Sequence, residues 1–110
     1  MGRGRCRGAS RSALRSYVVR AAAAADIRRA YVWYERQRDG LGEEFLATLR
    51  VLIDDVASGP EAFPILHRDT RRALVNRFPY GLFFRVIDNT VVFVACYHTR
   101  RNPASWKRRR

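Results

Sequence analysis

The spacing of hydrophobic positions changes twice along the chain, and each change predicts a different kind of element. A short apolar run at residues 17–19 predicts a strand. Over residues 22–38, and again over 41–57, apolar side chains recur at the i, i+3, i+4, i+7 spacing of amphipathic helices. Asp39 and Gly40 lie between these two runs and are typical of a turn. The pattern therefore predicts a hairpin of two antiparallel helices.

The second half of the chain is patterned for strands. After a proline-containing loop, strands are predicted over residues 72–78, 82–87 and 91–98. Turn-forming residues at 88–90 predict a hairpin between the last two strands. The final strand is apolar on both faces, which predicts a central, covered position in the sheet. A short helix is expected over residues 104–110.

The predicted order is β-α-α-β-β-β. This order indicates an α+β fold in which an antiparallel sheet packs one face on the helical hairpin. The other face of the sheet is expected to be open and concave. We expect residues 16–110 to form one domain and residues 1–15 to form a disordered basic tail, because the tail has little to bury.

The net charge of +12 is concentrated at the two ends of the chain. Residues 1–20 carry six arginines and no acidic residue, and residues 98–110 carry six basic residues and no acidic residue. The middle of the chain is neutral. This distribution predicts binding to polyanions, which are either nucleic acids or acidic protein segments.

The sequence contains no metal-binding or nucleotide-binding motif, so no cofactor and no metal site are expected. Cys6 and Cys96 lie far apart, and free cysteines are typical of a reducing cytoplasm. No apolar run approaches the roughly 20 residues of a membrane helix. These features predict a cytoplasmic protein that does not bind membranes.

Basic and aromatic residues gather in the predicted strands. If these strands form a meander, several arginines and His98 are expected to share the open face, where they would grip phosphate groups. In a metal-free ribonuclease, His98 and Tyr80 or Tyr97 would transfer protons, and Arg85 would stabilise the scissile phosphate. The alternative is that these are solvent-facing residues of a half-exposed sheet, without a catalytic role.

Several short motifs follow one another in order over residues 16–108. They are Asp26-Ile27-x-x-Ala30-x-x-Trp33-Tyr34-Glu35, Gly40-Leu41-Gly42-x-x-Phe45-Leu46, Pro60-x-x-Phe63-Pro64, Arg71-Arg72-Ala73-Leu74, Arg77-Phe78-Pro79-Tyr80-Gly81 and His98-x-Arg100-Arg101-x-Pro103-x-x-Trp106. Together these motifs resemble those of toxins of the RelE/ParE superfamily. The resemblance implies the toxin of a type II toxin–antitoxin (plasmid stabilisation) system, which inhibits growth and is silenced in a heteromeric complex with a cognate antitoxin.

The resemblance leaves the target open. ParE-like members inhibit DNA gyrase, whereas RelE-like members are metal-free endoribonucleases that cleave mRNA, often on the ribosome. The mRNA-cutting members carry an arginine early in the third strand, where this chain has Gly81, and this departure favours the ParE-like function. A third alternative is a non-toxic basic module that binds nucleic acid. The residues predicted to bind the target or the antitoxin are Arg72, Arg77, Arg85, Tyr97, Arg100, Arg101 and Trp106.

Overall fold

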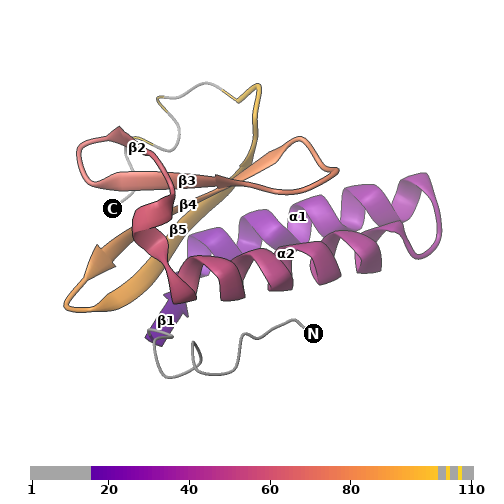
Figure 1. Ribbon diagram of the computed structural model, residues 1–110. Coiled ribbons are helices and arrows are strands. Elements are labelled where there is room, and N and C mark those ends of the chain that lie inside the picture. The colour runs from indigo at the N-terminus through magenta and orange to yellow at the C-terminus, as the bar shows by residue number, and fades with distance from the viewer. Residues whose placement is uncertain (1–15, 102–103, 105–106, 108–110) are drawn as a thin grey trace.

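Two helices lie across one face of a five-stranded sheet (Figure 1). The computed structural model describes residues 16–101, 104 and 107. The strand order in the sheet is β1-β5-β4-β3-β2. The elements are β1 (Ser16–Val19), α1 (Ala21–Gln37), α2 (Leu41–Ser58), the 3-10 turn η2 (Pro60–Ala62), β2 (Ile65–His67), β3 (Thr70–Leu74), β4 (Tyr80–Ile87) and β5 (Thr90–His98).

The predicted helical hairpin is confirmed, and its turn is held by one side chain. The carboxylate of Glu35 accepts hydrogen bonds from the backbone N–H groups of Gly40, at 2.9 Å, and Gly42, at 2.8 Å. Gly40 adopts a left-handed conformation with φ of 88°, which suits glycine because it has no Cβ. The turn therefore satisfies backbone groups that the helix ends leave without partners.

The main hydrophobic core lies between the helical hairpin and the sheet. Phe45 of α2 and Phe84 and Phe93 of the central strands are fully buried there. The tight turn between β4 and β5 is formed by Asp88 and Asn89, which both have positive φ. Two such residues suit the twist of a two-residue hairpin. Strand β5 lies between β1 and β4 and is buried from Val91 to Tyr97, so its predicted central position is confirmed.

The sheet differs from the prediction in the direction and number of its strands. It is mixed, because β1 pairs with β5 in parallel, with Ser16 opposite Thr90 and Val19 opposite Phe93. The β4–β5 hairpin leaves one edge of β5 free, and β1 covers that edge. Residues 65–67, predicted as loop, form the short edge strand β2. The predicted strand over 72–78 begins earlier, at Thr70. It also ends earlier, at Leu74, and Arg77 adopts a positive φ of 73° in the turn that follows.

The face of the sheet opposite the helices, called here the second face, is not the open concave surface that was predicted. Phe83, Val94 and Tyr97 on this face are each less than 5% exposed. Long arginine side chains cover part of it, since Arg72 lies across Gly81 and Arg101 stacks on Tyr97. Arginine can cover apolar surface in this way because its stem is aliphatic and only its head is charged.

The C-terminal helix predicted over 104–110 falls mostly outside the described residues, although Ala104 and Lys107 are both helical. The predicted tail over 1–15 also lies outside the described residues. Neither described helix is both long enough and apolar enough to cross a membrane.

Candidate functional site

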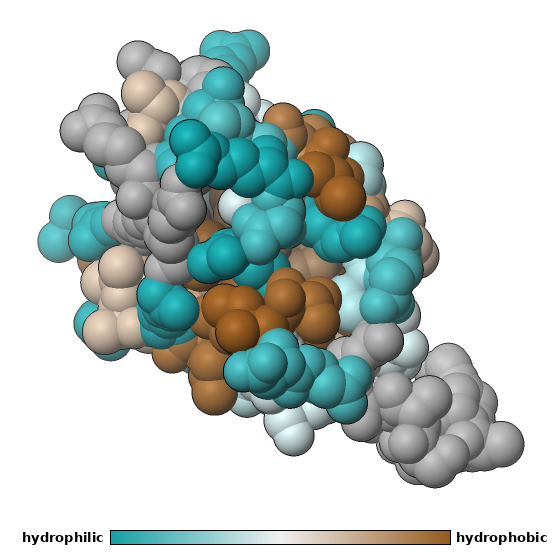
Figure 2. All heavy atoms as spheres, turned by 90° about the vertical axis from the view of Figure 1, so that its left-hand side faces the viewer, coloured by the Kyte–Doolittle hydropathy of each residue, from teal (hydrophilic) through white to brown (hydrophobic). Residues whose placement is uncertain are grey.

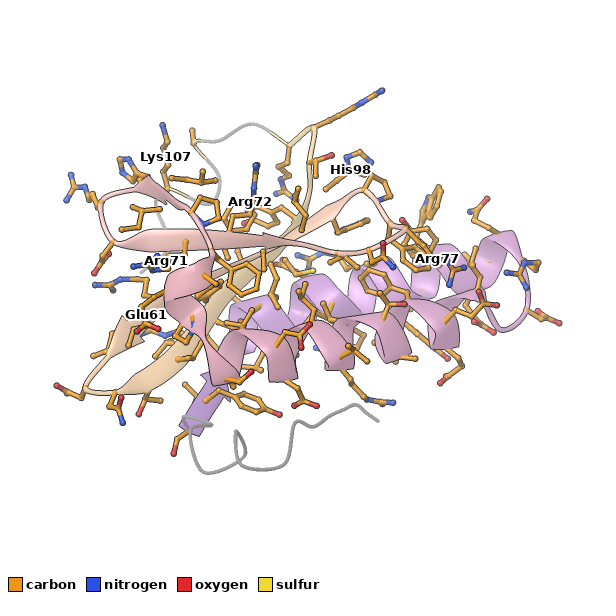
Figure 3. The ribbon with its side chains drawn as sticks, in the orientation of Figure 1. Glu61, Arg71, Arg72, Arg77, His98 and Lys107 are labelled. Carbon is orange, nitrogen blue, oxygen red and sulfur yellow. The ribbon has the colours of Figure 1, made fainter. Side chains whose placement is uncertain are left out.

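A groove of about 920 Å³ runs between helix α1 and the end of the sheet where β4 begins and β5 ends. Figure 3 shows Arg77 and His98 toward this end of the sheet, where β3 turns into β4. The groove is lined by Asp26, Arg28, Arg29, Ala30, Val32, Trp33, Tyr34 and Arg36 of α1 and by Pro79, Tyr80, Cys96, Tyr97, His98 and Arg101.

The buried carboxylate of Asp26 joins α1 to the sheet beneath the groove. Strand β1 ends at Val19, opposite Phe93, so no strand among the described residues pairs with the edge of β5 beyond that point. The carboxylate of Asp26 supplies a hydrogen-bond acceptor at this edge, since it accepts the backbone N–H of Cys96 at 3.1 Å. The guanidinium of Arg29 donates to the other carboxylate oxygen. These contacts compensate the burial of the charge.

A row of aromatic rings forms one side of the groove. The exposed ring of Trp33 packs edge-to-face on Tyr34, with 5.1 Å between ring centroids. Tyr34 in turn contacts Tyr80 at 6.0 Å, and Tyr80 contacts His98 at 5.5 Å. Trp33 is 55% exposed, which is unusual for so large an apolar side chain. An exposed tryptophan at a groove is typical of a binding site.

Positive charge surrounds these rings. Arg28, Arg29 and Arg36 are exposed along α1, and Arg101 lies at the opposite side of the groove. Arg29 is neutralised by Asp26, whereas no acidic residue among the described residues forms an ion pair with the other three. The groove thus combines an apolar floor with a cationic rim, which suits a partner that carries both apolar and acidic groups.

Burial favours the protonated forms of the thiol and the phenols in the floor of the groove. It raises the pKa of the Cys96 thiol to about 12, and the nearby Asp26 charge acts in the same direction. Burial also raises the pKa of the Tyr80 and Tyr34 phenols. A thiol that stays protonated is a poor nucleophile, and a protonated phenol does not act as a base. These properties favour binding over nucleophilic catalysis.

The structure separates Arg85 from His98 and Tyr80, the other two residues predicted to catalyse RNA cleavage. His98 pairs with Tyr80 on the helix side of the sheet, whereas Arg85 lies on the second face beside Val92. The Nε and Nη2 groups of Arg85 both donate to the carboxylate of Asp69, at 2.9 and 2.8 Å. The expectation that His98 shares a face with the arginines is therefore wrong.

The physical reason for this separation is an irregularity in β5. Strict alternation would place residues 92, 94, 96 and 98 on one face. The register shifts between Phe83, which pairs with Ala95, and Phe84, which pairs with Phe93. Val94 is the extra residue of this bulge, so every position after it changes face.

The other residues predicted for binding are spread over several surfaces. Arg72 lies on the second face, and Tyr97 lies on that face while also lining the groove. Arg77 donates to Glu44 of α2 at 3.0 Å. Arg100 is exposed after β5, and its backbone N–H donates to the imidazole Nδ1 of His98 at 3.1 Å. Arg101 lines the groove. Trp106 lies outside the described residues.

The sequence analysis missed the contribution of α1 to the groove. Arg29, Trp33 and Arg36 follow i, i+4, i+7 spacing, which places them on one helix face, and this signal is present in the sequence. Asp26 was also missed, although an acidic residue in an apolar helix stripe indicates a buried partner. Within the described parts of the chain, no group of three or more potential metal ligands lies together.

The far end of the molecule offers a less continuous surface. Figure 2 shows that hydrophobic patches there are separated by hydrophilic side chains. Ile65 and Leu66 of β2 are 53% and 38% exposed. The groove beside α1 is therefore the stronger candidate site.

Comparisons with known proteins agree with this fold. A sequence model of the ParE toxin family, described as the ParE toxin of the type II toxin–antitoxin system parDE, matches residues 17–103. A solved structure described as the chromosomal ParDE TA system from P. aeruginosa superposes with a TM-score of 0.70 and 16% sequence identity, covering 77% of this chain and 96% of that chain. No curated protein matches the chain significantly. Because the family match spans most of its length, the chain belongs to the ParE toxin family of type II toxin–antitoxin systems.

Proposed function

We propose that this toxin arrests growth by binding and inhibiting a target enzyme such as DNA gyrase, and that a cognate acidic antitoxin neutralises it in a heteromeric complex. The observation that carries the proposal is the groove beside α1, with its exposed Trp33 and its cationic rim. An inhibitor of this kind needs a surface rather than a set of reacting groups.

The antitoxin segment that fits the groove has apolar side chains flanked by carboxylates. Its apolar groups would pack on Trp33 and the floor, and its carboxylates would pair with Arg28, Arg36 and Arg101. Such rim pairs speed association and select the partner, while the buried aromatic contact supplies most of the affinity. In this proposal the antitoxin lies along α1.

Three features favour inhibition by binding over RNA cleavage. Arg85 lies on the other face of the sheet from His98, its guanidinium is held by Asp69, and the phenol of Tyr80 has a raised pKa. The contact between Tyr80 and His98 is the one feature that would suit acid–base chemistry. The variant His98→Ala therefore separates the two functions.

The test is tightly induced expression in a bacterial host, with separate pulses of labelled thymidine and labelled amino acid. We expect DNA synthesis to fail first, with filamentation, and purified toxin to inhibit DNA supercoiling by gyrase. Trp33→Ala should reduce this inhibition by about thirtyfold or more, since a central aromatic anchor contributes about 2 kcal/mol or more to an interface. His98→Ala should change it by less than about threefold.

The matched control is Val51→Ala, because Val51 is a 62% exposed apolar residue on the other helix of the hairpin. It should leave inhibition unchanged. Rapid loss of protein synthesis that is abolished in His98→Ala would instead establish the ribonuclease function. Normal growth despite a folded, expressed protein would indicate a non-toxic binding module.

A further inference from the structure

The turn between β3 and β4 carries one wall of the groove, and its path runs through a strained residue. Arg77 in this turn has a positive φ of 73°, a conformation that residues with a Cβ rarely adopt. The next residue, Phe78, is buried in the core, where its ring lies 4.9 Å from that of Tyr34. Pro79 and Tyr80 follow directly and line the groove. The position of this wall therefore depends on what holds Arg77 in place.

One carboxylate of α2 holds the side chain of Arg77. The guanidinium of Arg77 donates to Oε1 of Glu44 at 3.0 Å, and the guanidinium of Arg38 donates to Oε2 of the same carboxylate at 3.1 Å. The hydrogen bonds from Arg77 and Arg38 lower the pKa of Glu44, so this carboxylate stays ionised at neutral pH. Figure 3 shows Arg77 between the β3–β4 turn and the helical hairpin.

Arg38 connects the same carboxylate to the opposite wall of the groove. It directly follows the last residue of α1, and its backbone N–H donates to the carbonyl oxygen of Tyr34 at 3.2 Å. Trp33 and Arg36 of α1 line the groove shortly before this point. Glu44 therefore joins the end of the helix wall to the turn that carries the other wall.

We propose that Glu44 is a positioning residue that fixes the separation of the two walls of the groove, which are α1 and the β3–β4 turn. This inference rests on the proposed function, because it assigns a role at the groove that binds the target and the antitoxin. A partner that contacts both walls binds more weakly when one wall has to be ordered first. Arg77, expected from the sequence to bind a partner directly, does not line the groove and acts through Glu44.

The ion pairs of Glu44 lie at the surface, which limits their contribution to overall stability. The side chains of Arg38, Glu44 and Arg77 are 58%, 39% and 57% exposed. Exposed ion pairs contribute little to folding, so variants of these residues should unfold at the same urea concentration as the parent chain. A change in binding by such a folded variant then reports on the groove itself.

The first measurement follows the turn directly, by amide hydrogen exchange of the full-length chain in NMR spectra. The N–H of Thr99 donates to the carbonyl oxygen of Pro79, and the N–H of Val75 to that of Tyr80, each at 2.9 Å, so both amides report on the turn. Glu44→Gln should raise both exchange rates about threefold, the effect expected from the loss of an exposed ion pair.

The matched control for this measurement is Glu43→Gln. Glu43 is the adjacent residue in the first turn of α2 and carries the same charge, but it bonds to Tyr31 and not to either arginine. It should leave both exchange rates unchanged. Exchange rates that are also unchanged in Glu44→Gln would refute the positioning role and leave the proposed function intact.

The second measurement is a double-mutant cycle on the inhibition of gyrase supercoiling. Glu44→Gln and Arg77→Gln should each weaken inhibition about threefold, because each removes the same ion pair. The double variant should also lose about threefold and not about ninefold, since the two residues act through one contact. Arg77→Lys keeps a cation for Glu44 and should retain most of the inhibition.

A loss of about ninefold in the double variant would show that Arg77 contacts the target independently of Glu44, against the positioning role. Full inhibition by Glu44→Gln, under conditions where Trp33→Ala has lost it, would also overturn the inference. If Trp33→Ala inhibited like the parent chain, or if the parent chain did not inhibit gyrase, the proposed function would fail instead. The hydrogen-exchange comparison of Glu44→Gln with Glu43→Gln would then still decide whether Glu44 positions the turn.

Discussion

At the scale of single residues, the buried carboxylate of Asp26 links helix α1 to the sheet. It is 4% exposed, yet it lies in the apolar stripe of α1 that also includes Ala23, Ala30 and Tyr34. Its bond to the Cys96 N–H holds α1 against β5 beyond the point where β1 ends. The position of the helix wall of the groove therefore depends on one hydrogen-bonded charge.

Replacement of Asp26 by alanine should destabilise the protein by about 1–3 kcal/mol, because it leaves the buried Cys96 N–H without an acceptor. Asp26→Asn keeps an acceptor oxygen and should therefore lower the free energy of unfolding by a smaller amount. Urea unfolding followed by circular dichroism measures both values. Asp54→Ala, which removes an exposed carboxylate from α2, serves as the control and should stay within about 0.5 kcal/mol of the parent chain. An Asp26→Ala variant as stable as this control would refute the structural role.

At the scale of elements, the turn between α1 and α2 depends on the close approach of the two helices at Gly42. A Cβ atom there would lie 2.7 Å from the ring of Tyr31 and 2.8 Å from Oε1 of Glu35. Neither group moves freely, since Tyr31 donates to Glu43 at 3.0 Å and Glu35 holds the turn. Glycine at this position follows from packing, because its φ is not positive.

We expect Gly42→Ala to lower the free energy of unfolding by about 1–3 kcal/mol, the range that overpacking typically costs. Gly59→Ala is the matched control, because a Cβ at Gly59 meets no atom within 4 Å and its φ of −164° is extended. It should be neutral or slightly stabilising, since it reduces the freedom of the unfolded chain. Equal stabilities of the two variants in thermal unfolding would show that the helices separate easily at this turn.

At the scale of the whole molecule, the fold is closed by a strand from the start of the domain. Strand β1 covers the free edge of β5, and the partly buried Val19 packs against the core. The backbone N–H of Arg20 then donates to the carbonyl oxygen of Phe93 at 3.0 Å, which directs the chain into α1. Residues far apart in the sequence therefore meet at this edge.

We propose that residues 16–110 are sufficient for folding. A chain lacking residues 1–15 should keep a cooperative unfolding transition, with a midpoint in urea close to that of the full chain. Removal of residues 1–20 also deletes β1, exposes the edge of β5 and takes Val19 from the core, so this chain should unfold at markedly lower urea concentration or fail to fold. If the shorter deletion were as damaging as the longer one, the proposed domain boundary would be wrong.

The sequence by itself determined the features that depend on local pattern. The helical spacing of apolar residues predicted the bounds of α1 and α2 to within one or two residues. The β4–β5 hairpin was predicted from Asp88 and Asn89, because these residue types tolerate positive φ. The continuous apolar character of residues 91–98 predicted that β5 lies in a central position of the sheet. The ordered motifs identified the superfamily, whereas the anionic partner indicated by the uneven distribution of the arginines stays a prediction. These features can be predicted because side-chain periodicity and turn chemistry act between near neighbours.

Only the tertiary structure decided which candidate residues share a surface. The bulge at Val94 moved His98 to the helix side, Asp69 engaged Arg85, and the stem of Arg72 filled the space over Gly81. The parallel pairing of β1 with β5 was also decided by the tertiary structure. Each of these depends on contacts between segments separated by many residues, and one extra residue in a strand reverses the face of every side chain that follows it.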